Sequence, residues 1–186
     1  MTTRSDIAAP SRIPTGAAAN GDGITEGSAG AVVDIYIDFL CPFCRMFEQQ
    51  HGGAIDQAVD RGRITAVYHP VGFLDRLSTT RYSTRAGAAA GCAADGGRFR
   101  EYRYTLFDRQ PPENSDGLSD EELTALATPA GLDVAFARCV RAGAYLGWTE
   151  YVTSLALARG VNGIPSVFVD GVGVPANARA ILATAA

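Results

Sequence analysis

Two cysteines separated by two residues are the chemically most informative feature of this chain. They stand in the sequence Cys41-Pro42-Phe43-Cys44, directly after an apolar strand pattern and at the start of a helical one. The free N–H groups and the positive dipole end of a helix N-terminus stabilise a thiolate, and thiols at this spacing can close into a disulfide and reopen. We therefore predict a redox pair, with Cys41 as the exposed attacking thiolate and Cys44 as the more buried resolving thiol.

Other uses of this cysteine spacing lack the residues that they need. A zinc site requires a second cysteine pair or paired histidines, whereas the other cysteines and histidines are isolated in the sequence (Cys92, Cys139, His51 and His69). A c-type haem attachment requires histidine after the second cysteine, where this chain has Arg45. We expect no metal and no cofactor, while an inert structural disulfide stays open as an alternative.

The elements that must position this pair follow from the periodicity of the apolar residues. Residues 31–40 are apolar and β-branched, as in a buried strand, and residues 45–61 show helical spacing. A second strand is predicted at 63–71, ending at Pro70.

A long helical block follows, and the chain then returns to a strand. We predict helices at 78–94, 98–109, 119–128, 133–142 and 145–159, a strand at 165–169 and a last helix at 177–185. Ser119 and Asp133 are predicted N-caps, and Gly160 a helix end. Strands that alternate with helices indicate an α/β sheet with covered faces, here carrying an inserted helical subdomain of roughly 90 residues.

Composition narrows the class of protein. The chain has 186 residues, of which 47% are hydrophobic and 19% charged, a balance that suits one globular core. Its net charge of −4, without a basic cluster, argues against nucleic acid as a partner. The sequence contains no apolar run of the length that a transmembrane helix needs. Residues 1–30 are rich in small and polar residues and lack a signal-peptide pattern, so we predict a flexible or loosely docked lead-in.

The cysteine pair, together with Gly163-Ile164-Pro165-Ser166-Val167-Phe168-Val169-Asp170-Gly171, resembles the DsbA-like thiol:disulfide oxidoreductases. Residues 73–78, Tyr82-Ser83 and Arg85-Ala86 are similar to the actinobacterial branch of that family. The resemblance runs from about Val32 to the C-terminus and implies a thioredoxin fold with a helical insertion. It divides the chain into a lead-in (1–30), an N-terminal thioredoxin part (31–76), the insertion (77–160) and a C-terminal thioredoxin part (161–186).

The resemblance also implies roles for particular residues. Pro165 would be the cis-proline that faces the cysteine pair, with a trans proline at a strand start as the alternative. Pro42, Phe43 and Ile164 would contact an extended substrate. Relatives from actinobacteria imply a structural disulfide between Cys92 and Cys139, with two buried free thiols as the alternative.

The chain departs from the family where a proton relay is expected. An acidic residue often lies buried six positions before the first cysteine, but Ile35 is there, flanked by Asp34 and Asp38. We assign the proton work to Asp38, the nearer of the two to Cys41, with a solvated strand-end aspartate as the alternative. We also predict an apolar collar around the pair, made of Phe39, Leu40, Phe43 and Phe73, with a place in the core as the equal alternative for each aromatic residue.

These features predict an enzyme that exchanges disulfides with unfolded or partly folded proteins, as an oxidase. A membrane quinone reductase of the type that the family uses would reoxidise it. The alternatives are a thioredoxin-fold chaperone or binding module with a redox-silent disulfide, a reductase or isomerase, and a glutathione-dependent enzyme, which the intact cysteine pair disfavours. A lasting structural disulfide predicts extracytoplasmic function, with the targeting segment absent from this chain; a cytoplasmic location is the alternative.

Overall fold

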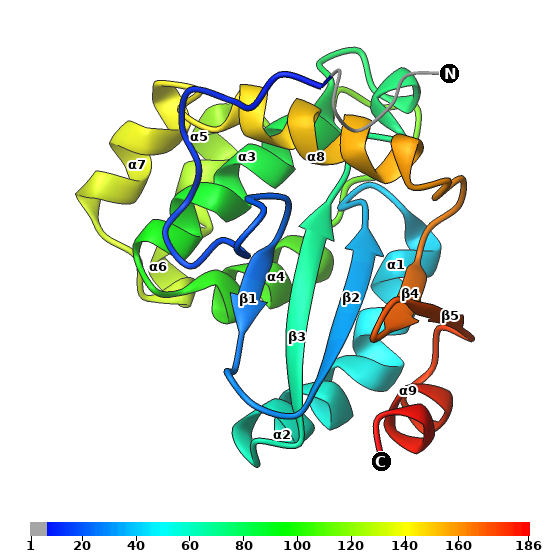
Figure 1. Ribbon diagram of the computed structural model, residues 1–186. Helices are drawn as coiled ribbons and strands as arrows, with labels where there is room; N and C mark the ends of the chain where they lie inside the picture. Colours follow the sequence, from blue (N-terminus) through cyan, green and yellow to red (C-terminus); the bar gives the residue numbers. More distant parts are fainter. Residues whose placement is uncertain (1–6) are drawn as a thin grey trace.

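A five-stranded mixed sheet forms the centre of the computed structural model, which describes residues 7–186 (Figure 1). Its strand order is β1-β3-β2-β4-β5, and the strands are β1 (Ile24–Glu26), β2 (Ala31–Ile37), β3 (Ile64–Pro70), β4 (Ser166–Val169) and β5 (Val172–Val174). Strands β2 and β3 are parallel, and the other neighbouring pairs are antiparallel. The predicted α/β class and thioredoxin-like fold are confirmed.

The helical segments fall close to the predicted ranges. They are α1 (Pro42–Phe47), the π-helical turn η2 (Glu48–Gly52), α2 (Gly53–Asp60), the 3₁₀ turn η3 (Asp75–Leu77), α3 (Tyr82–Asp95), α4 (Phe99–Asp108), α5 (Asp120–Ala125), α6 (Ala127–Ala130), α7 (Val134–Arg141), α8 (Leu146–Ala158) and α9 (Ala178–Thr184). Among the described residues, no helix combines the length and the apolar character that crossing a membrane requires.

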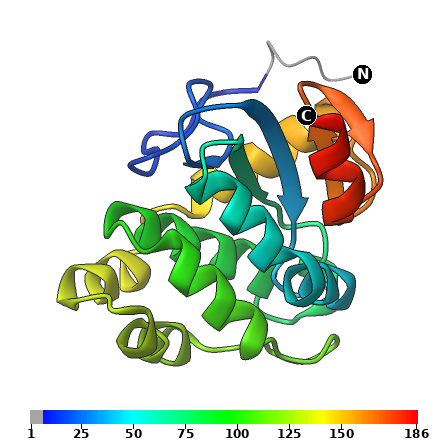
Figure 2. The same cartoon turned by 90° about the horizontal axis from the view of Figure 1, so that it is seen from below.

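Helices cover the sheet from both sides (Figure 2). Side chains alternate between the faces of a strand, so neighbours on β3 meet different helices. Tyr68 packs against Phe99 of α4, with ring centroids 5.5 Å apart. The adjacent residue His69 lies on the other face, which α8 crosses. The layers leave β2 in the middle of the molecule, with the cysteine pair at its C-terminal end.

The insertion between β3 and β4 contains α3 to α8, and local signals in the sequence set its helix ends. Ser119 forms a capping box with Glu122, and the Asp133 side chain caps α7, as predicted. Small residues let α3 approach α8 closely: a Cβ on Gly87 would lie 2.7 Å from Thr149. These contacts fix the insertion on the sheet.

A buried arginine ties the helix that follows the cysteine pair to the insertion. Arg103 of α4 is fully buried, and its guanidinium donates to Glu48 (3.1 Å) and Asp56 (3.0 Å). It also lies 4.0 Å from the ring centroid of Tyr68. Removing one partner from a buried ion pair leaves an uncompensated charge, so this cluster holds η2 and α2 against α4.

The structure differs from the prediction at the N-terminal lead-in. Residues 24–26 form β1, which pairs with β3, and the Trp148 indole donates to the Gly21 carbonyl (2.7 Å). Residues 21–26 therefore dock on the sheet and α8, while residues 1–6 lie outside the described range. Strand β5 was also not predicted. Both strands have three residues, too few to show a period, and tertiary pairing forms them.

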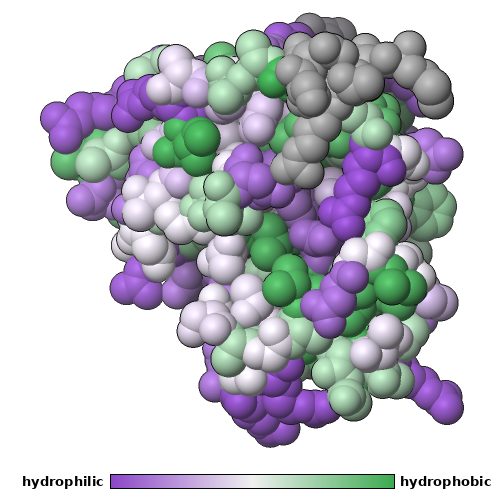
Figure 3. Space-filling model, in the orientation of Figure 1, coloured by the Kyte–Doolittle hydropathy of each residue, from purple (hydrophilic) through white to green (hydrophobic). Residues whose placement is uncertain are grey.

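Apolar side chains gather over the sheet on the face seen in Figure 3. The exposed large apolar residues include Val32 of β2 and Val172 of β5, which are 42% and 62% exposed. Strand β5 lies at the edge of the sheet, next to β4. The edge strand β5 thus leaves an apolar side chain exposed to solvent.

Candidate active site

Cys41 and Cys44 lie where β2 ends and α1 begins. Cys41 is the N-cap of α1, with an extended backbone, and Pro42 occupies the first helical position, where a missing N–H costs nothing. The Cys41 N–H donates to the Asp38 carbonyl (3.0 Å), which closes the turn. From Pro42 the chain stays helical through η2 and α2 to Asp60.

The two thiols have opposite electrostatic environments. Hydrogen bonding from the Cys44 thiol lowers the pKa of Cys41 to about 7, and the backbone N–H groups of Phe43 and Cys44 act in the same direction, against burial and the Asp38 charge. Cys44 is fully buried, and burial raises the pKa of its thiol well above the usual value. At neutral pH the thiolate therefore belongs to Cys41.

One prediction about Cys41 is wrong: the residue is not openly exposed. Only 4% of it is accessible, and its Sγ lies 3.8 Å from the carbonyl oxygen of Ile164. Because Tyr36 of β2 pairs with Ser166 of β4, the preceding peptide Ile164–Pro165, which is cis, lies beside Cys41. The burial of Cys41 could not be predicted from the spacing of residues in the sequence, because the segment that covers it lies more than a hundred residues away.

Asp38 is buried beneath the pair. Its carboxylate accepts the N–H groups of Leu40 (2.8 Å) and Leu74 (2.9 Å) and has no exposed surface. Burial raises the pKa of Asp38 to about 6, although these hydrogen bonds lower it. The alternative of a solvated strand-end aspartate is therefore wrong, because the loop after β3 closes over the carboxylate.

The predicted apolar collar is only partly present. Phe39 and Leu40 are each 1% exposed and belong to the core, so their assignment to the collar is wrong. Phe73 is half-buried, whereas Phe43 is 65% exposed and stands next to Cys41. Met46, one helical turn further, is 44% exposed and was not predicted. The exposed apolar surface at the pair thus comes from α1.

The contacts of the two histidines are with residues other than the cysteine pair. His69 is buried, and its ring nitrogens bond to the Asp22 carbonyl oxygen (2.6 Å) and to Asp34 (2.9 Å), as a structural histidine would. The half-buried His51 packs against Phe47. Within residues 7–186, no group of three or more histidine, cysteine or acidic side chains is arranged to hold a metal ion.

Sequence reasoning missed Gln110, which touches the turn of the pair. Its side-chain Nε2 donates to the carbonyl oxygens of Phe39 (2.9 Å) and Cys41 (3.0 Å). Nothing in the local sequence marks it, since glutamine after a helix is usually a solvated loop residue. The only sequence signal is the following Pro111-Pro112, which ends the helix at that point.

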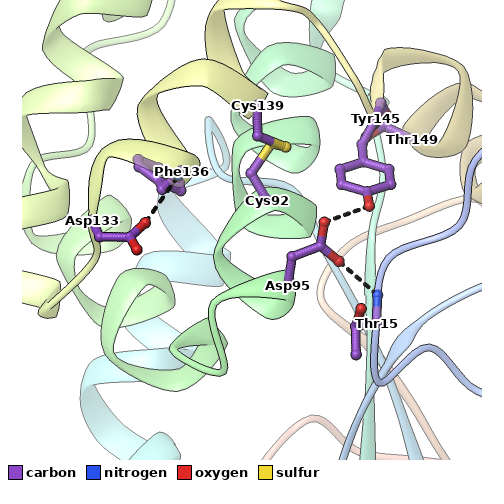
Figure 4. Close-up of a disulfide and its surroundings, with 8 residues drawn as sticks. All are labelled: Thr15, Cys92, Asp95, Asp133, Phe136, Cys139, Tyr145 and Thr149. Carbon is purple, nitrogen blue, oxygen red and sulfur yellow. Dashed lines mark hydrogen bonds between the residues drawn. A yellow bond between two sulfur atoms is a disulfide. The ribbon is translucent and has the colours of Figure 1, made fainter.

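Cys92 and Cys139 form a disulfide, with their Cα atoms 5.8 Å apart (Figure 4). It joins α3 to α7, both inside the insertion. Beside it, Asp95 accepts hydrogen bonds from the Tyr145 hydroxyl (2.5 Å) and the Thr15 N–H (2.8 Å). The disulfide therefore lies among the helices of the insertion, which carry no part of the Cys41–Cys44 turn.

Comparisons with known proteins point to one family. A family model described as Thioredoxin matches residues 20–181. The crystal structure of reduced DsbA from Mycobacterium tuberculosis is 36% identical and has a TM-score of 0.73, and the match covers 82% of this chain and 84% of that one. MdbA, a thiol-disulfide oxidoreductase from Corynebacterium diphtheriae, has a TM-score of 0.76 over 95% of both chains; at 23% identity it supports the fold alone.

A second relative is much longer than the segment that this chain matches. The serine/threonine-protein kinase PknE of Mycobacterium tuberculosis is 36% identical over 138 residues, which make up 69% of this chain. The match covers 24% of the kinase, so the chain spans about a quarter of the length of the curated relatives that it matches.

Proposed function

The chain belongs to the thioredoxin family; from that premise we propose that it is a protein disulfide oxidoreductase of the DsbA-like branch, that Cys41 and Cys44 carry its redox chemistry and that it acts as an oxidase. The observation that supports this most is the contrast between the thiols: the pKa of Cys41 is lowered to about 7, and that of Cys44 is raised well above the usual value. A reactive thiolate beside a protonated partner suits an attacking and a resolving thiol.

In the oxidase cycle the Cys41–Cys44 disulfide is the electron acceptor. A substrate thiolate attacks the Cys41 sulfur, the bond between Cys41 and Cys44 breaks, and a mixed disulfide forms between Cys41 and the substrate. Cys44 leaves as a thiolate and takes up one of the protons that the substrate thiols release on ionisation. A second substrate thiolate then attacks the substrate sulfur of the mixed disulfide and releases Cys41 as a thiolate. The substrate is oxidised to a disulfide, and two electrons remain on the dithiol pair.

The surroundings of Cys41 suit an extended protein substrate. Pro42 and Phe43 are exposed, and the carbonyl oxygen of the half-buried Ile164 lies 3.8 Å from the Cys41 sulfur. A polypeptide lying between these residues would present its cysteine to Cys41 and its backbone to the segment at Pro165. The proposed substrates are therefore unfolded or partly folded proteins, in which such segments are accessible.

The reduced cysteine pair must be reoxidised after every turnover. Each turnover leaves a dithiol, so an oxidase needs an electron acceptor, for which we propose a membrane quinone reductase.

A disulfide such as Cys92–Cys139 persists in oxidising compartments, which supports extracytoplasmic function. Fractionation of cells that express the native gene tests this, and a purely cytosolic pool would contradict it.

We expect the Cys41–Cys44 pair to be a moderate oxidant. Stabilising the thiolate favours the reduced form and raises the potential, while the buried Asp38 beside it opposes the thiolate. The potential should lie above that of thioredoxin, about −270 mV, and below about −120 mV, the value of the strongest oxidants of this fold. Equilibration with glutathione buffers, followed by quantification of alkylated Cys41, measures it.

Unfolding of the oxidised and reduced forms gives an independent check, because an oxidising disulfide destabilises the fold relative to the dithiol. Cys92–Cys139 must stay closed in both forms for this comparison. A potential at or below that of thioredoxin would identify a reductase instead.

Asp38 is proposed to accept the proton of Cys44 when this thiol resolves a mixed disulfide. Because the pKa of Asp38 is raised to about 6, its carboxylate becomes available as pH rises through that value. Asp38→Asn should therefore slow resolution by about 100-fold and abolish the rise of the rate across about pH 6. Stopped-flow measurement of mixed-disulfide decay against pH tests this.

Stability provides a control for Asp38. A buried acid whose pKa is raised on folding costs stability above its folded pKa and none below its unfolded pKa of 3.8, so the cost grows between these values to about 3 kcal/mol. Asp38→Asn should thus gain stability relative to the wild type as pH rises from about 4 to about 7. An unchanged rate profile in a variant that shows this gain would leave Asp38 a structural residue only.

A second function is favoured by one observation, the 4% exposure of Cys41. A thioredoxin-fold binding module with a silent cysteine pair would also bury its thiols. The two functions differ in reactivity, since a silent pair would not react with iodoacetamide in the native protein, whereas a redox-active Cys41 would.

A further inference from the structure

The side-chain amide of Gln110 bonds the turn that carries Cys41 from outside the cysteine motif. Its Nε2 lies 2.9 Å from the Phe39 carbonyl oxygen and 3.0 Å from that of Cys41, a residue 69 positions earlier in the chain. Both partners are acceptors, so the amide nitrogen and not the amide oxygen must face the turn. Both N–H groups of the amide are therefore used on this one stretch of backbone.

Helix α4 places Gln110 at this point. The helix ends at Asp108, and the Gln110 N–H still bonds to the Phe107 carbonyl (3.4 Å). Pro111 then restricts the Gln110 backbone and prevents the helix from continuing. The ring of Phe107 packs on that of Phe39, with centroids 5.0 Å apart. At the end of α4 the insertion thus meets the active-site turn through an aromatic contact and a side-chain amide.

The bonded carbonyls determine where the Cys41 sulfur lies. The Cys41 carbonyl also accepts the Arg45 N–H (3.1 Å), the first hydrogen bond of the active-site helix. Fixing the backbone from Phe39 to Cys41 keeps the sulfur close to the N–H groups of Phe43 and Cys44. The amide also offsets the negative end of the Cys41 carbonyl dipole, which lies in the same residue as the thiolate.

We propose that Gln110 is a positioning residue of the redox centre: through the Phe39 and Cys41 carbonyls it holds the cysteine turn against the helical insertion and favours the thiolate form of Cys41. This inference rests on the proposed function, because it assumes that Cys41 is the reactive thiol. It gives the helical insertion a role in the redox chemistry of Cys41, beside any role in substrate binding.

The charged groups around Cys41 must be considered before a pH effect is assigned to Gln110. Cys44 on α1 and Asp38 in the preceding turn act on the Cys41 thiol electrostatically. The contacts from the two other elements, Ile164 before β4 and Gln110 after α4, are neutral. A change at Gln110 therefore alters hydrogen bonding to the turn without removing a neighbouring charge.

Three substitutions separate donation from charge and from packing. Gln110→Met keeps the length and removes both donors, Gln110→Glu places a carboxylate against two carbonyls, and Gln110→Lys restores a donor with a positive charge. The readout is the pH midpoint of Cys41 alkylation by iodoacetamide in the reduced protein, followed by peptide mass spectrometry. Gln57→Met, the same chemical change on the exposed surface of α2, is the matched control.

We expect a wild-type midpoint at about pH 7. Gln110→Met should raise it by about half a unit, the loss of part of a typical hydrogen bond, and Gln110→Glu should raise it further. Gln110→Lys should leave the midpoint at or below that of the wild type, and Gln57→Met should not change it. If Gln110→Met does not fold, Gln110→Leu, which also lacks a donor and a charge, takes its place, because the opposite shifts of the Glu and Lys variants would follow from charge alone.

A midpoint that is the same in Gln110→Met and the wild type would overturn the inference, whatever happens to the stability of the variant and to the midpoints of the two charged variants. It would leave the proposed function intact, because Cys41 would still react. A wild-type Cys41 that does not react at any pH would overturn both, so the two failures are distinguishable.

Discussion

Cys41→Ser should reduce disulfide exchange to the uncatalysed background, a loss of about a thousandfold or more, as expected when a covalent nucleophile is removed. A serine hydroxyl at this position is not ionised near neutral pH, whereas Cys41 readily forms a thiolate there because its pKa is lowered to about 7. Refolding of a reduced, disulfide-containing test protein measures the exchange directly. The fold should tolerate the change, since serine is close to cysteine in size.

Cys44→Ala should have a different effect. The Cys41 thiolate of this variant can attack a substrate disulfide, but no second thiol is present to release the substrate, so mixed disulfides accumulate. Non-reducing electrophoresis detects them, and the double variant Cys41→Ser with Cys44→Ala should trap none. Trapping through Cys44 in the Cys41→Ser variant would reverse the two roles. Full activity of Cys41→Ser would remove the redox assignment altogether.

The position of the cysteine pair could be predicted from the sequence because local signals determine it. The apolar run of β2 changes to helical spacing at Cys41, and Pro42 suits the first helical position. The helices of the insertion also carry their own caps, such as Ser119 and Asp133. Where neighbouring residues decide the structure, the residue pattern is sufficient.

The surroundings of the pair could not be predicted, because distant segments create them. The burial of Asp38 depends on Leu74, which lies 36 residues later, and the cover over Cys41 depends on Ile164. Gln110 reaches the turn only because α4 ends beside Phe39. No periodicity encodes such contacts. The acidity of the two thiols, which decides their chemistry, is thus set largely by tertiary structure.

Replacing both Cys92 and Cys139 by serine should lower the free energy of unfolding by about 4 kcal/mol. The disulfide closes a loop with a sequence separation of 47 residues, and a crosslink of this length reduces the entropy of the unfolded chain by that amount on the chain-entropy model. Urea unfolding of the wild type and the double variant, with Cys41 and Cys44 replaced by serine in both, isolates this effect.

The same background provides a control for the crosslink. A reductant should destabilise the parent protein by a similar amount and leave the double variant unchanged, because the variant has no disulfide to lose. In a variant that lacks only Cys92 and Cys139, the chemistry at Cys41 should be unaffected, because the disulfide joins α3 to α7 and neither helix carries the active-site turn. A loss below about 1 kcal/mol would show that the unfolded chain is already restricted without the crosslink. Recovery of Cys92 and Cys139 as free, alkylated thiols from the untreated protein would contradict the pairing itself.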